Sequence, residues 1–222
     1  MIRTVLNDIE KEKLGVTMCH EHFIVDLDRV RHDGISMIET PAEVEPEIKK
    51  MMALGVQAAV EVSTIDLGRD VRKLKQISLD TGLTIVASTG FYLTQYHPDW
   101  LKTASAQQIA EVYVRELTEG IDDTGIRAGI IAEIASSPER FEGEEKKILK
   151  AAGIASRLTG AAVSTHTGRA TAVETIETLL AEGVDPDKII IGHQDLIDDT
   201  KYHCQLLNYG VNLAFDTCGK KV

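Results

Sequence analysis

The stretch VETIETLLAEGVDPDKIIIGH, residues 173–193, contains the pattern that decides the fold. Apolar residues recur at helical spacing from Val173 to Leu180 and predict one apolar helix face. Gly183 follows, where glycine can take the left-handed conformation that ends a helix. The run Ile189-Ile190-Ile191 is apolar at every position, which is typical of a strand buried on both faces of a parallel sheet. The stretch therefore predicts a helix, a glycine stop and a parallel strand.

The same pattern repeats along the chain. Strand candidates alternate with helical stretches, and successive strand ends lie about 30 residues apart, as in a βαβ unit. The candidates are Val16–His20, Val56–Val62, Leu83–Thr89, Arg127–Glu133, Ala161–His166, Lys188–His193 and Val211–Asp216. Helices are expected to end directly before a strand at Gly55, Gly82, Gly160, Gly183 and Gly210.

Strict alternation of strands and helices leaves two architectures, an open doubly wound sheet and a (β/α)8 barrel. A dinucleotide-binding open sheet should carry a G-x-G-x-x-G turn after its first strand, and the residues after His20 contain none. We therefore predict an α/β fold of the TIM-type (β/α)8 barrel class. No linker or composition shift divides the chain, so residues 1–222 are predicted to form a single domain. Such a barrel needs about 250 residues, and only six residues follow Asp216, so we expect truncation after strand 7.

The composition excludes several classes of protein. The chain has 35 acidic and 24 basic residues, a net charge of −11 and no basic cluster, which argues against nucleic-acid or anionic-membrane partners. It has no run of about 18 apolar residues, and its charged first 15 residues do not resemble a signal peptide. Three widely spaced cysteines, Cys19, Cys204 and Cys218, favour reduced thiols. We predict a cytoplasmic protein that acts on a small molecule.

Histidines gather at the predicted strand ends. His20, His22, His166 and His193 close or flank a strand candidate, and Glu133 closes another. The carboxyl ends of barrel strands converge on the mouth, where active sites lie. Imidazoles suit zinc and similar ions, and a carboxylate can bridge two of them. Each histidine alone is more often a hydrogen-bonded core residue, but together the five residues predict a transition-metal site.

Four segments resemble the phosphotriesterase-related family of the amidohydrolase superfamily. They are GVTMCHEH (15–22), AGIIAE (128–133), STHT (164–167) and IGHQD (191–195), and the resemblance covers the whole chain. It implies a distorted TIM barrel with two divalent metal ions at its mouth. By this resemblance His20 and His22 bind one metal, His166 and His193 bind the second, and Glu133 holds the bridging position.

A glutamate at the bridging position resembles the branch of phosphotriesterase homology proteins, because the phosphotriesterases and lactonases carry a carboxylated lysine there. The segment FDTCGK (215–220) also resembles this branch, and Thr217 follows Asp216 where the lactonase branch has an arginine. The implied activity is hydrolysis of a carboxylic ester, lactone or phosphoester by a hydroxide that two metals share. Zinc is expected, with manganese, cobalt and iron as alternatives. Tyr92 matches a family position beside the metals and is predicted to orient substrate, or else to line the wall.

The end of the chain departs from the family. No residue matches the eighth-strand aspartate that ligates the first metal and takes the proton of the bridging water, and Asp216 belongs to strand seven. Asp195 is predicted either to support the metal site or to cap a helix. An open barrel exposes the edges of its first and last strands, so a homo-oligomer, a dimer, is expected. The alternative function is a catalytically inactive metal-binding partial barrel that acts through oligomerisation.

Overall fold

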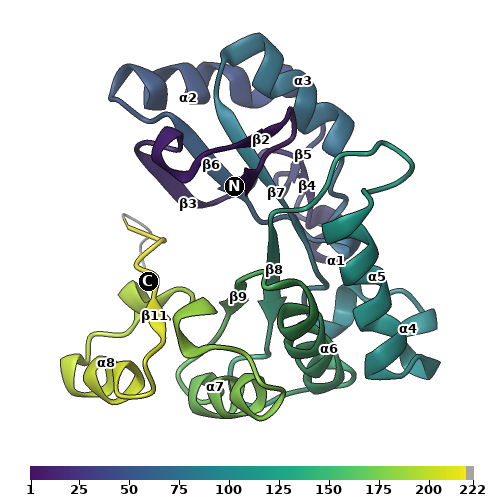
Figure 1. The fold of residues 1–222 in the computed structure, drawn as a ribbon, viewed down its shortest axis with the longest axis vertical. Coiled ribbons are helices and arrows are strands. Elements are labelled where there is room, and N and C mark those ends of the chain that lie inside the picture. Colours follow the sequence, from purple (N-terminus) through teal and green to yellow (C-terminus); the bar gives the residue numbers. More distant parts are fainter. Residues whose placement is uncertain (219–222) are drawn as a thin grey trace. The chain divides into compact units, whose positions relative to one another are not determined.

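A computed structural model describes residues 1–218 of the chain, which form two compact units. Unit 1 comprises residues 1–89 and 115–130, and unit 2 comprises residues 90–114 and the chain from Ile131 onward. Both are built from parallel strands that alternate with helices (Figure 1). The prediction of a single domain over residues 1–222 stays a prediction.

Unit 1 contains a parallel sheet in the order β3, β6, β7. Its strands are β3 (Thr17–Glu21), β6 (Ala58–Glu61) and β7 (Thr84–Thr89), and α2 (Pro41–Ala53) and α3 (Val71–Thr81) connect them and pack together. Thr40 and Glu43 form a capping box at the start of α2, which satisfies backbone N–H groups that the helix itself leaves unpaired. The shorter elements are β1 (Ile2–Arg3), β2 (Asp8–Ile9), η1 (Lys11–Lys13), β4 (Val25–Asp26), α1 (Asp28–Arg31), β5 (Met37–Ile38) and η2 (Ile65–Leu67).

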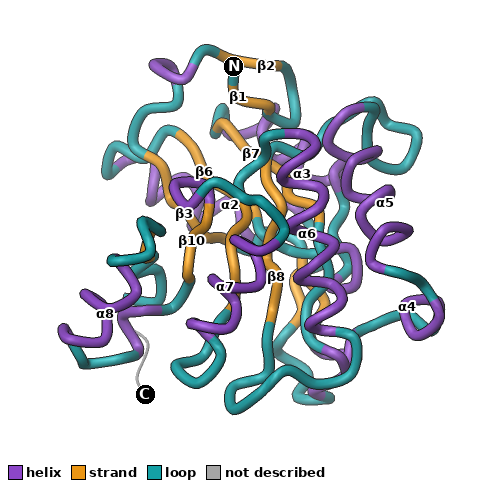
Figure 2. The backbone as a smooth tube through the Cα atoms, turned by 60° about the horizontal axis from the view of Figure 1, so that its bottom comes forward, coloured by secondary structure: helices purple, strands orange, loops and turns teal. Residues whose placement is uncertain are grey.

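Unit 2 contains parallel strands in the order β8, β9, β10, β11. Its strands are β8 (Ile130–Ala135), β9 (Val163–His166), β10 (Ile189–Ile191) and β11 (Asn212–Leu213). The helices α6 (Glu145–Thr159) and α7 (Ala172–Ala181) pack against each other and against β9 and β10 (Figure 2). The remaining elements are η3 (Thr94–Tyr96), α4 (Trp100–Thr103), α5 (Ala106–Thr118, which ends in unit 1), η4 (Pro186–Lys188), η5 (Gln194–Leu196) and α8 (Thr200–Leu207).

The helix ends follow the glycine pattern predicted from the sequence. Gly82 ends α3 with φ 80° and Gly160 ends α6 with φ 77°, and each donates its N–H to a carbonyl one turn back. The other three predicted glycines also have positive φ. These stops are placed directly before β7 and β9, which lets each strand return to its sheet.

Every predicted strand has an observed counterpart, in the predicted order. Two strands end at other residues than predicted. Strand β8 runs past Glu133 to Ala135, and β10 ends at Ile191, before His193. The hairpins β1–β2 and β4–β5 were not predicted. Residues 1–218 contain no eighth strand of the series, and within them no helix is long and apolar enough to cross a bilayer.

Candidate metal centre

Glu133 lies inside β8 rather than at its end. The pairing of β8 with β9 shifts register between Ile131 and Ile134, and such irregularities re-aim side chains. The Glu133 side chain is only 2% exposed. A carboxylate this deeply buried requires polar or cationic partners.

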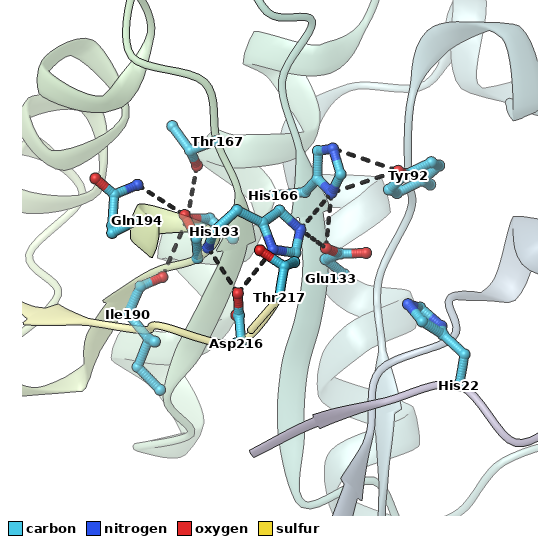
Figure 3. A network of polar contacts seen from close by, with 12 residues as sticks. His22, Tyr92, Glu133, His166, Thr167, Ile190, His193, Gln194, Asp216 and Thr217 are labelled. Atoms are coloured by element: carbon cyan, nitrogen blue, oxygen red, sulfur yellow. Dashed lines mark hydrogen bonds and ion pairs between the residues drawn. The ribbon is translucent and has the colours of Figure 1, made fainter. Parts of the chain in front are cut away.

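Two histidines supply those partners (Figure 3). The Oε1 atom of Glu133 lies 2.8 Å from Nδ1 of His166 and 3.0 Å from Nε2 of His193. The two imidazole nitrogens are 2.8 Å apart, and their rings meet edge to face with centroids 4.4 Å apart. Three potential ligand atoms from β8, from the end of β9 and from the loop after β10 thus converge on one point.

His193 is held from its other side by Asp216. Its backbone N–H donates to Oδ1 of Asp216 over 3.0 Å, and its Nδ1 lies 2.8 Å from the same oxygen. Burial alone would lower the pKa of His193, but hydrogen bonds to the carboxylates of Asp216 and Glu133 outweigh it and raise the pKa to about 9. With this raised pKa both ring nitrogens of His193 carry a proton, and they donate to Asp216 through Nδ1 and to Glu133 through Nε2. Loss of the Nε2 proton to an arriving cation would leave Nδ1–H on Asp216 and a lone pair on Nε2, which is the tautomer a metal ligand needs.

The sequence prediction did not assign Asp216 to the site. The residue was excluded from the role of the eighth-strand aspartate, and the structure instead makes it the partner of His193. A signal was present, because an acidic residue closed an apolar strand candidate as Glu133 did. The loop after β11 is in turn held by Asp195, which accepts hydrogen bonds from the backbone of Asp216 and from the Thr217 hydroxyl, so Asp195 supports the site. Asp199, not Asp195, caps α8.

Tyr92 lies beside the cluster, in the segment after β7. Its ring packs edge to face on His166 with centroids 5.1 Å apart, and its hydroxyl lies 3.4 Å from the ring nitrogens of His166. His97 contacts the Tyr92 carbonyl through Nε2 at 2.9 Å. Tyr92 therefore places a hydroxyl at the edge of the cluster.

The other two predicted ligands lie together in unit 1. The rings of His20 and His22 have centroids 5.4 Å apart, and Nδ1 of His22 lies 3.0 Å from the hydroxyl of buried Ser63. The pairing of β3 with β6 shifts register between Met18 and Glu21, so the strand is irregular where His20 lies.

The predicted site residues are therefore divided between the two units. Unit 2 brings together Glu133, His166, His193 and Tyr92, and unit 1 pairs His20 with His22. Gly219 and Lys220 of the segment 215–220 lie outside the described residues.

Comparisons with known proteins extend over both units. A family model described as the phosphotriesterase family matches residues 1–222. The phosphotriesterase homology protein of Escherichia coli K12 is 34% identical over 93% of this chain and 71% of that protein. An aryldialkylphosphatase of Saccharolobus solfataricus is 31% identical over 96% of this chain and 69% of its own length. An N-acetyltaurine hydrolase of Xenopus tropicalis is 29% identical over 97% of this chain and 75% of its own length.

A solved structure shares the arrangement of strands and helices. The crystal structure of phosphotriesterase homology protein from Escherichia coli, complexed with phosphate in its active site, matches with a TM-score of 0.90 at 33% identity. The match covers 94% of this chain and 72% of that one. The TIM-type barrel class predicted from the sequence is thereby confirmed.

Proposed function

Because the chain belongs to the phosphotriesterase family, we propose that it is a hydrolase that cleaves an ester-type or amide bond in a small molecule with the help of divalent metal ions. The family resemblance drawn from the four sequence motifs is confirmed, and so is the prediction of an ester-cleaving enzyme class. The names of the relatives include a phosphatase and an amide hydrolase, which supports a bond class broader than the predicted esters.

The convergence of Glu133, His166 and His193 carries the proposal. Tetrahedral zinc ligands about 2.0–2.1 Å from the metal lie roughly 3.3 Å from one another. These three ligand atoms are separated by 2.8 to 3.0 Å, so a bound ion requires them to move apart by only a few tenths of an ångström. Two imidazoles and one carboxylate also form a donor set that zinc commonly takes. The residues present therefore fit a divalent cation, and we propose His20, His22, Glu133, His166 and His193 as the ligands of two ions.

When bound, two divalent ions that share a hydroxide would supply a nucleophile near neutral pH and stabilise negative charge on the substrate oxygen. The chain's own residues orient the candidate ligands and the substrate. Asp216 fixes the tautomer and the ring orientation of His193, and Glu133 keeps the two imidazoles of unit 2 together. The Tyr92 hydroxyl is proposed to orient the substrate beside His166.

The proposal is tested first by elemental analysis of protein purified without chelator, followed by hydrolysis of chromogenic carboxylic, lactone and phosphate esters. We expect close to two metals per chain and turnover that a chelator abolishes. Glu133→Gln should lower both the metal content and the rate. Glu139→Gln is the matched control, because Glu139 is an exposed glutamate in the loop after the same strand.

Rates that neither a chelator nor Glu133→Gln changes would contradict the proposal. Bound metal without turnover on any substrate class would instead favour the non-catalytic partial barrel. The homodimer and the cytoplasmic location stay predictions, and sedimentation at several protein concentrations measures the first.

A further inference from the structure

Glu145 is a second buried glutamate of unit 2, and it lies outside the metal cluster. It is the first residue of α6 and has no exposed surface. Its Oε1 atom accepts hydrogen bonds from the backbone N–H of Thr94 (3.3 Å), the hydroxyl of Thr94 (3.2 Å) and the hydroxyl of Ser137 (2.7 Å). Its Oε2 atom accepts from the backbone N–H groups of Ser137 and Glu142, both over 2.9 Å. One carboxylate thus lies within hydrogen-bond distance of five donor groups, of which the Thr94 hydroxyl shares its single proton with the carbonyl oxygen of Glu142.

The donors come from two segments that lie far apart in the sequence. Thr94 follows Tyr92 by two residues, and Ser137 follows Glu133 by four residues. The segments also touch directly, because the Thr94 hydroxyl lies 2.9 Å from the carbonyl oxygen of Glu142. A Cβ atom on Gly143 would lie 2.7 Å from the Thr94 side chain, so the contact leaves no room for a larger residue.

We propose that Glu145 is a positioning residue, whose carboxylate holds the Tyr92 segment against the loop after β8 and so fixes the Tyr92 hydroxyl beside His166. The catalytic consequence rests on the proposed function, whereas the tie between the two segments stands on the contacts alone. Glu145 does not touch the candidate ligands, and it acts through Tyr92.

The chemistry of the five donors requires a carboxylate. An ionised carboxylate offers only lone pairs, about four acceptor sites, whereas a glutamine amide replaces half of them with N–H donors. Glu145→Gln would therefore turn an N–H group toward N–H or O–H donors, and buried polar groups left unpaired are costly. An acidic residue that only stabilises the helix dipole does not need this burial, because it is enough for its charge to lie near the positive end of the helix. The neighbouring Glu144 meets that condition without full burial.

The chain carries a natural reporter for this segment. Trp100 is its single tryptophan, and its ring packs edge to face on Phe91 with centroids 5.6 Å apart. Phe91 directly precedes Tyr92. Tryptophan fluorescence therefore reports on the order of the Tyr92 segment without any assay of activity.

The first experiment compares acrylamide quenching of Trp100 in the wild-type chain, Glu145→Gln, Thr94→Val and the control Glu144→Gln. The control removes the same charge from the same helix end. Thr94→Val keeps the side-chain shape and removes one donor at a half-buried position, so it provides a milder test if Glu145→Gln folds poorly. We expect quenching to increase in Glu145→Gln, to increase less in Thr94→Val and to stay unchanged in Glu144→Gln. Equal quenching in all four proteins would overturn the inference.

The second experiment is a double-mutant cycle on the metal-loaded enzyme with Tyr92→Phe and Glu145→Gln. Misplacement of a positioned group by about 1 Å can cost on the order of 100-fold, so we expect kcat/KM to fall roughly 10- to 100-fold in Glu145→Gln. The metal content should not change. The double variant should be no slower than the slower single variant, because both changes remove the same positioned hydroxyl.

Additive losses would show that Glu145 affects the rate only by loosening the fold, and they would overturn the positioning role. A wild-type chain without hydrolysis on any ester would contradict the proposed function instead. In that case a quenching difference between Glu145→Gln and Glu144→Gln still supports the contact that Glu145 makes between the Tyr92 segment and the loop after β8. Equal quenching in these two variants still refutes that contact.

Discussion

Replacing Asp216 by asparagine is expected to weaken metal binding and to lower the pKa of His193. Asp216 accepts two hydrogen bonds from His193, one from the backbone and one from Nδ1. The Asp216 side chain is 1% exposed, so little water competes for these contacts. Asparagine has nearly the same shape and keeps one acceptor oxygen for these contacts, but it removes the charge and replaces the second carboxylate oxygen with an NH2 group.

The size of the expected effect follows from the pKa of His193. Its pKa rises from 6.5 to about 9, and at about 1.4 kcal/mol per pKa unit this corresponds to roughly 3 kcal/mol as an upper limit. Glu133 contributes part of the rise, so we expect Asp216→Asn to lower the His193 pKa in the metal-free protein by about one unit or more. Loss of a carboxylate that orients a histidine ligand commonly costs 10- to 100-fold in metal affinity.

The raised pKa also fixes the direction of a pH effect on stability. A histidine with a higher pKa in the folded chain than in the unfolded chain stabilises the fold fully below about pH 6.5, and this contribution is lost as pH rises through about 9. Asp216→Asn should flatten the fall in the free energy of unfolding of the metal-free protein between these two values.

The assay combines NMR titration of the histidine Cε1 protons, with His193 assigned through His193→Gln, and competition for zinc against a chelator of known affinity. Asp198→Asn serves as the control, because Asp198 is an exposed aspartate in the loop after His193. The reasoning is refuted if Asp216→Asn leaves both the His193 pKa and the zinc affinity at the values of the control.

Two further predictions concern buried charges in unit 1. Glu61 has no exposed surface, and burial raises its pKa to about 7. Between about pH 4.5 and 7 the folded chain therefore keeps a proton on Glu61 that the unfolded chain releases. The free energy of unfolding should fall as pH rises through this range. Glu61→Gln should remove this dependence, which urea midpoints at pH 5 and pH 8 would show. The buried pair of Arg69 and Glu116 is joined by two hydrogen bonds of 2.7 and 3.0 Å, and Arg69→Met should cost about 3–5 kcal/mol of unfolding free energy because it leaves a buried charge unpaired. The double variant with Glu116→Met should recover most of that loss in the same urea assay, and no recovery would contradict the explanation.

The alternation of strands and helices could be predicted because it depends on local properties. A run such as Ile189–Ile191 is apolar at every position, and Gly82 and Gly160 end their helices through a conformation that depends on the missing Cβ. The grouping of Glu133, His166 and His193 could be predicted for a related reason, because parallel strands bring polar residues at their carboxyl ends to the same edge. Both inferences need only the sequence and the geometry of a βα unit.

Details that depend on distant partners could not be predicted. The register shifts in β3 and β8 arise from pairing with neighbouring strands, and they decide where His20 and Glu133 lie. The role of Asp216 depends on His193, 23 residues earlier in the chain. A single sequence indicates that such residues are present, but the contacts that assign their roles form only in the folded chain.

Three glutamates show why residue type alone does not reveal function. Glu133 faces two imidazole nitrogens, which leave its carboxylate able to share a cation with them. Glu145 faces five N–H and O–H donors, so its lone pairs are already taken and it can only hold the backbone in place. Glu61 accepts the backbone N–H of Phe23 over 3.3 Å, and hydrogen bonds with Ser63 and the backbone of Ile24 also favour its charged form. Desolvation by burial outweighs these contacts, so the carboxyl group of Glu61 retains its proton to a higher pH. All three side chains are buried. The groups around each carboxylate distinguish the candidate metal ligand Glu133, the positioning residue Glu145 and the protonated core residue Glu61. For this reason Glu133→Gln should change the metal content, Glu145→Gln the order of the Tyr92 segment, and Glu61→Gln only the pH dependence of stability.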